Sequence, residues 1–135
     1  MDLTNNNNYG YIGKFFLGTV GGEDDTCTGK KQEIRILLDT GSANSWIMSE
    51  EALPDDYDEA TVSDKKRRHV FDPEKSCGGT FDEPDDDHKQ HVHITFGSGD
   101  LRGYFVHDTC TIGDIESDND DDRLILPNYQ FGMVT

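Results

Sequence analysis

Apolar and β-branched residues occur along the chain in short runs that are separated by Gly, Pro, Asn and Asp. Residues 11–20 and residues 34–38 form two such runs, and each is typical of a β-strand that ends at a turn. No long stretch repeats at the 3.6-residue period of an amphipathic helix. The pattern therefore predicts an all-β chain.

The second half of the chain favours a long hairpin. Residues 91–96 alternate between polar and apolar, residues 97–100 (Gly-Ser-Gly-Asp) give a turn signal, and residues 101–112 are apolar and β-prone. We expect these segments to pair as two antiparallel strands joined by a tight turn.

A last strand candidate covers residues 124–134, where Pro127 and Gly132 are expected to break it. The remaining polar stretches predict surface loops. These loops are Gly21 to Lys31, the charged excursion at residues 49–68 and the acidic run at residues 116–122.

Length, composition and charge limit the function classes. The chain has 135 residues, of which 33% are hydrophobic, and this content suits one small core. Its formal net charge of -16 repels nucleic-acid phosphates and anionic membrane surfaces. We expect neither as a partner, and the basic run at residues 65–68 is interpreted as a solvated loop.

The N-terminal residues carry neither a basic region nor an apolar core, so no signal peptide is expected, and no segment predicts a membrane span. Cys27, Cys77 and Cys110 form an odd set, so at least one thiol is unpaired within the chain. Their spacing determines neither the pairing nor the cellular compartment.

One short motif can carry chemistry. Asp39-Thr40-Gly41-Ser42 directly follows apolar residues 36–38, whose run predicts burial on both faces up to the carboxylate. In such a place desolvation and nearby dipoles control the pKa of an Asp. Gly41 permits a tight turn, while Thr40 and Ser42 supply hydroxyls that can orient the carboxylate. Alone, the tetrapeptide is also a common turn.

The sequence around this motif resembles the pepsin-like aspartic proteases. The matching blocks follow that family's order, and they are Tyr11 to Thr19, Ile36 to Ile47, Val70 to Phe81, Ile94 to Gly103, Asp108 to Gly113 and Asn128 to Gly132. The resemblance covers nearly the whole chain outside the inserted loops. It implies that residues 1–135 form part of an N-terminal lobe, an incomplete double-psi type β-barrel with a catalytic loop at 36–47 and a flap hairpin at about 91–112.

The resemblance also implies a function, an aspartic-type endopeptidase without cofactor or metal. In that family each of two lobes gives one aspartate, and the pair activates a water that attacks an extended peptide or protein substrate. Asp39 is then the catalytic residue of this lobe. Thr40 and Gly41 hold its loop, Ser42 bonds its carboxylate, and Trp46 lies behind the flap. The flap residues over the substrate are Phe96, Gly97 and Ser98.

Two departures from the family pattern open an alternative. The usual flap residue is tyrosine, but Phe96 has no hydroxyl, and no second Asp-(Thr/Ser)-Gly follows Asp39. We expect the second aspartate in a missing C-terminal lobe and the isolated chain to be inactive. A symmetric homodimer lacks the packing strand that it would need. The alternative is a catalytically inactive module that binds peptides or proteins.

We expect no metal site, and the cellular compartment follows from the resemblance alone. His91 and His93 alternate on one strand face with His88 nearby, but their spacing fits no common zinc signature. The run at 118–122 lacks the Gly and distal Glu of a calcium loop. The resemblance alone suggests a secretory, vacuolar or extracellular protein, and it gives no role to the Gly21 to Lys31 insertion.

Overall fold

The computed structural model describes residues 3–5, 10–23, 26–63, 67–81, 91–97 and 99–135. These residues form strands and short 3-10 turns, with no α-helix among them. The strands are β1 (Leu3–Asn5), β2 (Tyr11–Leu17), β3 (Gln32–Leu38), β4 (Trp46–Met48), β5 (Thr80–Phe81), β6 (His91–Phe96), β7 (Gly99–Gly113) and β8 (Arg123–Val134). The 3-10 turns are η1 (Glu50–Ala52), η2 (Pro73–Lys75) and η3 (Asp120–Asp122). The predicted all-β class is confirmed.

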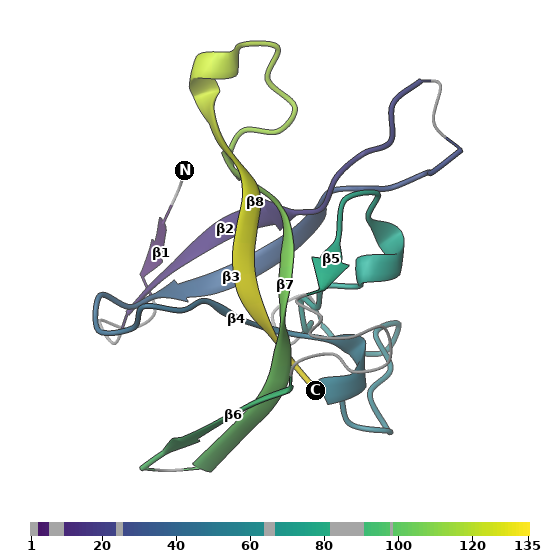
Figure 1. Cartoon of the computed structure of the whole chain (residues 1–135). Helices are drawn as coiled ribbons and strands as arrows, with labels where there is room; N and C mark the ends of the chain where they lie inside the picture. Colours follow the sequence, from purple (N-terminus) through teal and green to yellow (C-terminus); the bar gives the residue numbers. More distant parts are fainter. Residues whose placement is uncertain (1–2, 6–9, 24–25, 64–66, 82–90, 98) are drawn as a thin grey trace.

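All eight strands belong to one mixed sheet (Figure 1). Its main path runs β1-β2-β7-β8-β4, while β3 pairs with β2, and β5 and β6 pair with β7. Every pairing is antiparallel except that of β4 with β8, which is parallel. Strand β7 therefore connects the N-terminal strands to the C-terminal ones.

Strand β7 has 15 residues and pairs along its length with four different strands. Its first part forms a hairpin with β6, from the Phe96–Gly99 pair to the His91–Tyr104 pair. Farther along, Tyr104, Val106, Asp108 and Cys110 are all buried. The alternation places every second side chain of β7 on the core face.

Strand β8 is continuous from Arg123 to Val134, so the expected breaks at Pro127 and Gly132 do not occur. The register passes from Asp108 opposite Tyr129 to Cys110 opposite Leu126, with a bulge between them. Asn128 takes the left-handed conformation there, with φ of 57°. Because proline has no N–H to donate, the bulge absorbs Pro127 and pairing resumes on both sides.

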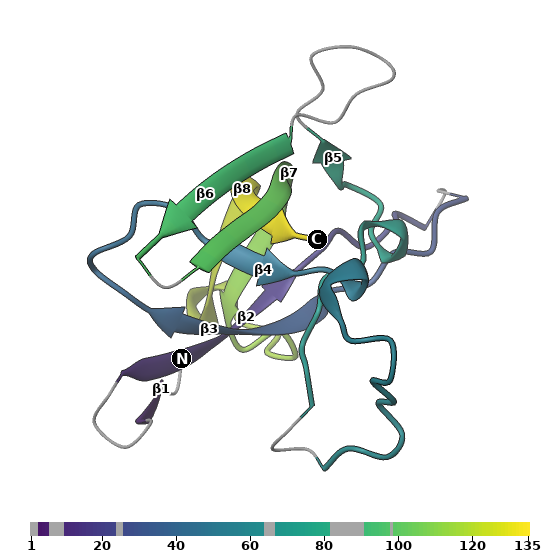
Figure 2. The same cartoon turned by 90° about the horizontal axis from the view of Figure 1, so that it is seen from below.

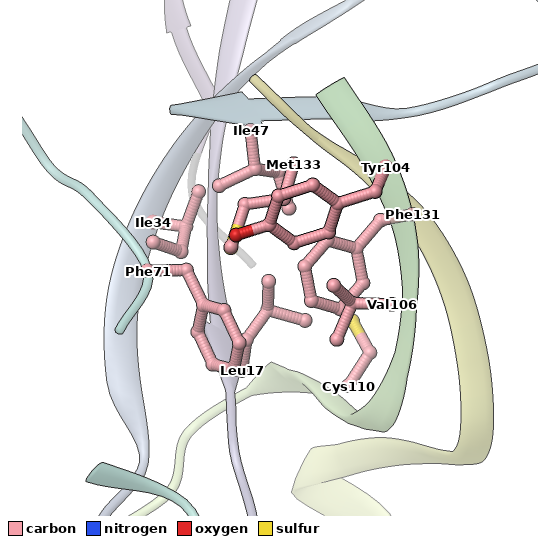
Figure 3. Close-up of a cluster of buried hydrophobic side chains, with 9 residues drawn as sticks. All are labelled: Leu17, Ile34, Ile47, Phe71, Tyr104, Val106, Cys110, Phe131 and Met133. Atoms are coloured by element: carbon pink, nitrogen blue, oxygen red, sulfur yellow. The ribbon is translucent and has the colours of Figure 1, made fainter. Parts of the chain in front are cut away.

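The hydrophobic core lies between the sheet and the loop that precedes η2 (Figure 3). Phe71 from this loop packs edge-on against Phe131 of β8, with ring centroids 5.2 Å apart. Its backbone N–H donates to the carbonyl of Met48, which anchors the loop beside β4. The buried side chains of this core are Leu17, Ile34, Ile47, Phe71, Tyr104, Val106, Cys110, Phe131 and Met133.

The N-terminal strands are displaced slightly from their predicted bounds. Strand β2 ends at Leu17 rather than at residue 20, because Gly18 takes a φ of 117° that an extended strand does not use. Strand β3 begins at Gln32, two residues before the predicted start. Between them, the predicted loop from Gly21 to Lys31 joins the rest of the fold through a Cys27–Cys77 disulfide.

The predicted burial of residues 36–38 on both faces is wrong. Leu37 is 56% exposed and Leu38 is 38% exposed. In the described part of the chain β3 pairs with β2 alone, so its outer edge and these side chains have no covering strand. Apolar edges of this kind promote association between chains.

The 135-residue chain is therefore expected to self-associate, and Leu37→Lys is expected to shift it toward monomer. A lysine on an edge strand opposes edge-to-edge pairing through its charge. Size-exclusion chromatography of both proteins at several concentrations measures the shift. A wild-type chain that stays monomeric at every concentration would contradict this expectation.

In the described residues, no helix has the length and apolar character needed to cross a membrane.

Candidate active site

Asp39 lies one residue beyond the end of β3, where the chain turns toward β4. Its two carboxylate oxygens have different partners. The Gly41 N–H donates to Oδ1 at 2.8 Å, and the Ser42 hydroxyl donates to Oδ2 at 2.7 Å. Thr40 and Gly41 form the turn itself, so the motif folds back on its own carboxylate.

These bonds favour the charged form of the carboxyl group. The Gly41 N–H, and after it the Ser42 hydroxyl, hold the pKa of Asp39 below its ordinary value, while burial acts weakly in the opposite direction. The side chain is exposed in this chain. From the sequence we expected desolvation to control the pKa of Asp39, but the two hydrogen bonds have the larger effect on it.

Gly41 occupies a position of the turn with little space for a side chain. A Cβ there would lie 3.2 Å from Oδ1 of Asp39, a tight contact that would press on the carboxylate. The glycine therefore allows its own N–H to approach the acid closely. This geometry gives a physical reason for glycine in the motif.

Strand β8 anchors the segment that follows Asp39. The N–H of Gly132 donates to the carbonyl of Ser45 at 2.8 Å, and the Ser45 hydroxyl bonds the Tyr129 hydroxyl. Trp46 then begins β4, which pairs with β8 from the Trp46–Gly132 position onward. A strand near the C-terminus thus fixes where the loop from Asp39 to Ser45 ends.

Trp46 packs on the same part of β8 and on β7. Its ring lies over Gly132, where a Cβ would come within 2.2 Å of two ring carbons. The ring centroid is 5.7 Å from that of Phe105. Sequence reasoning singled out Trp46 but missed the glycine and the phenylalanine that hold it.

We expect Gly132→Ala to displace Trp46 and to destabilise the fold by about 1–3 kcal/mol, the usual cost of overpacking. Trp46 is the single tryptophan of the chain, so its fluorescence emission reports the displacement directly. Gly99→Ala is the matched control, because a Cβ at Gly99 meets nothing within 4 Å. Identical emission spectra and melting curves for Gly132→Ala and wild type would contradict the packing described here.

Asp39 opens onto a cleft of about 350 Å³. The cleft is lined by apolar residues of β2 and β3, including Phe15, Leu37 and Leu38, and by the loop that leads to Trp46. In the view of Figure 2 the loop between β3 and β4 and the β6–β7 hairpin both extend toward the left. A ligand in the cleft would contact both apolar side chains and the carboxylate.

The structure describes only part of the predicted flap. Phe96 ends β6 opposite Gly99, and Gly97 occupies the exposed turn with open space around it. Ser98 lies outside the described residues, and so does the side chain of Phe96. Contact of these residues with Trp46 or with a substrate therefore stays a prediction.

A second polar site, which the sequence analysis did not assign, is buried where the end of β2 meets β7. Asp108 is 2% exposed, and it accepts hydrogen bonds from the Thr19 hydroxyl at 2.8 Å, the Ser76 hydroxyl at 2.6 Å and the Thr109 N–H at 2.7 Å. The Thr19 N–H donates in turn to the Ser76 hydroxyl. This network joins the end of β2, the loop after η2 and β7, which is a structural role.

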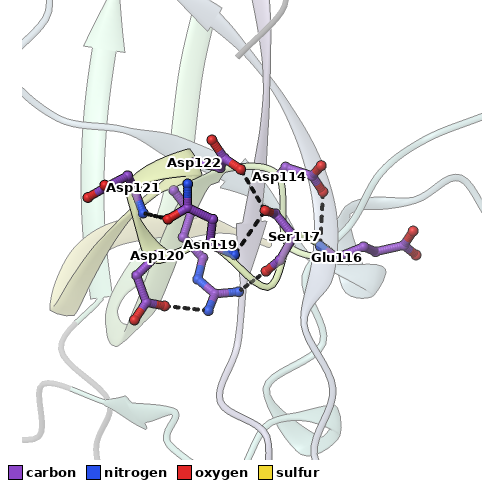
Figure 4. A network of polar contacts seen from close by, with 8 residues as sticks. Asp114, Glu116, Ser117, Asn119, Asp120, Asp121 and Asp122 are labelled. Atoms are coloured by element: carbon purple, nitrogen blue, oxygen red, sulfur yellow. Dashed lines mark hydrogen bonds and ion pairs between the residues drawn. The ribbon is translucent and has the colours of Figure 1, made fainter.

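Several polar side chains of the acidic loop before β8 bind one another (Figure 4). The Arg123 guanidinium donates to the Asp120 carboxylate and to the Ser117 carbonyl, and the Ser117 hydroxyl donates to Asp122. Among the described residues, no group of three His, Cys, Asp or Glu side chains could hold a metal ion. His93 instead lies 3.5 Å from the Asp100 carboxylate, and His88 falls outside the described residues.

The fold and the Asp39 turn agree with the comparison to known proteins. The sequence model described as "Eukaryotic aspartyl protease" matches residues 26–122, and the chain belongs to this family. The matched segment includes Asp39, Trp46 and the β6–β7 hairpin.

Several curated relatives are named for members of the pepsin group. The chain is 32% identical to gastricsin of Oryctolagus cuniculus over 123 residues, which are 91% of this chain and 23% of that protein. It is 30% identical to chymosin of Camelus dromedarius over 125 residues, 93% of this chain and 24% of that protein. Pregnancy-associated glycoprotein 1 of Ovis aries is 29% identical over 107 residues, 79% of this chain and 22% of that protein. The chain thus spans about a quarter of the length of these relatives.

Proposed function

We propose that this chain is part of the N-terminal lobe of an aspartic endopeptidase and that Asp39 is one of its two catalytic carboxylates. The observation that carries the proposal is the turn around Asp39. Both carboxylate oxygens accept a hydrogen bond from the motif itself, which orients the group and favours its ionised form. Membership in the eukaryotic aspartyl protease family supports the same class of reaction.

The chemistry needs a second carboxylate, which we assign to a C-terminal lobe of the same protein. Two carboxylates at close range share one proton, because like charges so near each other do not both ionise. The ionised member takes a proton from a bound water, which attacks the peptide carbonyl. The protonated member polarises that carbonyl, and a proton then reaches the leaving nitrogen.

The substrate is proposed to be an extended peptide or protein segment. It would lie in the cleft beside Asp39, under the β6–β7 hairpin, and pair through its backbone while pockets bind alternate side chains. Phe96, Gly97 and Ser98 would form the flap, and Trp46 would support it from β4. The apolar lining from Phe15 and Leu38 favours apolar side chains near the cleaved bond.

A peptide-binding module without activity is the second candidate, and Phe96 favours it because the flap hydroxyl is absent. Hydrolysis of an unstructured peptide by the full-length protein between acid and neutral pH separates the two. We expect cleavage with an acid optimum and inhibition by a pepstatin-type compound. Peptide binding without cleavage at any pH would contradict the peptidase and support the binding module.

A further inference from the structure

Five of the 12 lysine and arginine residues of the chain line a single cleft of about 260 Å³. Lys30 and Lys31 precede β3, Arg67 and Arg68 come from the long loop after η1, and Lys75 belongs to η2. The fold therefore brings together basic segments that lie far apart in the sequence. In a chain with a net charge of -16, such a concentration of cations is an exception.

Three carboxylates also line this basic cleft, but each already has a cation beside it. Asp72 lies 2.6 Å from Lys75, Glu59 lies 3.5 Å from Arg67, and Glu33 lies 3.3 Å from Lys14 and 3.5 Å from Arg35. The negative charge of the cleft is thus engaged by other side chains.

Three cations of the cleft lie beyond ion-pair distance of the described carboxylates, and of these Lys30 still contributes through its charge to the lowered pKa of Asp72. Within the described residues, Lys30, Lys31 and Arg68 form no ion pair. His69 lies beside them, with Nδ1 3.3 Å from the Glu33 carbonyl oxygen and 3.9 Å from its carboxylate. Its other nitrogen, Nε2, is buried and has no hydrogen-bond partner in the described part of the chain. Recognition in this cleft therefore rests on Lys30, Lys31 and Arg68.

We propose that this basic cleft binds an acidic segment of another polypeptide, whose carboxylates pair with Lys30, Lys31 and Arg68. A segment with several carboxylates fits better than one small oxyanion, because the cations come from separate loops around the cleft. At physiological salt the Debye length is about 8 Å, so most of the chain's distant negative charge is screened there. Arg68 can bind a carboxylate in a bidentate manner, and the two lysines add point charges.

The basic cleft adjoins the start of β3, whereas Asp39 follows its end. Seven strand residues at about 3.3 Å each separate the two by roughly 20 Å, so an acidic segment bound here does not occupy the cleft beside Asp39. The proposal is therefore independent of the proposed peptidase activity.

Fluorescence anisotropy with a labelled octaglutamate peptide tests this proposal, and octaglutamine is the neutral control probe. We expect the wild-type protein to bind octaglutamate and not octaglutamine. The double variant Lys31→Gln/Arg68→Gln is expected to bind about tenfold more weakly, which corresponds to about 1.4 kcal/mol. Both side chains lie at the surface of the cleft, and circular dichroism checks that the variant folds.

The matched control is Arg102→Gln/Arg123→Gln, which removes the same charge from positions that neither line the cleft nor pair with one of its carboxylates. It is expected to change the affinity less than about twofold, since distant surface charges are screened. Equal losses in the two double variants would show attraction by overall charge and overturn the proposal. Absence of octaglutamate binding would overturn it too. Complete displacement of the peptide by inorganic phosphate at a concentration equal to that of the peptide would also overturn it.

Discussion

Replacing both Cys27 and Cys77 by serine is expected to lower the free energy of unfolding by about 2–4 kcal/mol. The disulfide joins residues 50 positions apart and closes a loop that contains β3, β4, η1 and η2. For a loop of this length the chain-entropy relation gives about 4 kcal/mol, and native disulfides commonly contribute 2–5. The change is large beside the whole stability of a small domain, which is about 5–15 kcal/mol.

The local contacts of Cys77 explain why losing the disulfide would also weaken the hydrogen bonds around it. Its N–H donates to the carbonyl of Thr19, and its sulfur accepts from the Gly29 N–H. The neighbouring Ser76 bonds the buried Asp108 carboxylate. Loosening this loop would therefore weaken the polar network that joins β2 to β7.

Urea unfolding of wild type and of the double serine variant measures the difference. Cys110 provides the internal control, because burial raises the pKa of its thiol to about 11. At neutral pH the folded wild-type protein should expose no reactive thiol, and the unfolded protein should expose one. Two or more reactive thiols in the unfolded, unreduced protein would contradict the Cys27–Cys77 pairing, as would equal unfolding curves for the two proteins.

The sequence was sufficient for the longer strands β2, β3, β6, β7 and β8, and insufficient for the short strands β1, β4 and β5 and for the surroundings of each strand. Short apolar runs predicted β2 and β3, and period-two alternation predicted the hairpin of β6 with β7, because each signal is local. The burial of Leu37 and Leu38 was predicted wrongly, since an apolar run shows that a residue can be buried and not which strand covers it. Pro127 was taken as a break, although a bulge accommodates it within β8.

In the candidate site, too, the residues that are contiguous in the sequence could be predicted, and those that come from distant segments could not. Asp39, Gly41 and Ser42 were identifiable because the motif is contiguous, and their hydrogen bonds lie within four residues. Gly132 and Tyr129 were not assigned a role, because they reach the loop after Asp39 across a parallel pairing between segments about 85 residues apart. Arg67 and Arg68 of the basic cleft were interpreted as part of a solvated loop, because the sequence does not show that Lys30 and Lys31 lie beside them.

Asp39→Asn in the full-length protein is expected to abolish peptide hydrolysis while leaving the fold nearly intact. An amide has almost the shape of a carboxylate, and its oxygen can still accept the Gly41 N–H. It cannot ionise or take a proton from the attacking water, so the general-base role is lost. The turn around residue 39 is exposed, so little packing depends on its charge.

The expected loss follows from the size of proton-transfer catalysis. General acid–base groups are typically worth about 100- to 10,000-fold in rate. Residues that act as a pair fail together, so removing one carboxylate removes most of what both supply. Ser42→Ala is a useful companion, because it removes one of the two hydrogen bonds that lower the pKa of Asp39 and keeps the carboxylate itself.

The most direct test is kcat/KM of the full-length protein and of Asp39→Asn on an unstructured peptide from acid to neutral pH. Thermal melting of both proteins serves as the folding control. We predict an acid optimum for wild type, matching melting curves, and a loss of at least about 100-fold in the variant at that optimum. An Asn variant that keeps a substantial fraction of wild-type kcat/KM would contradict the assignment of Asp39 as a catalytic carboxylate.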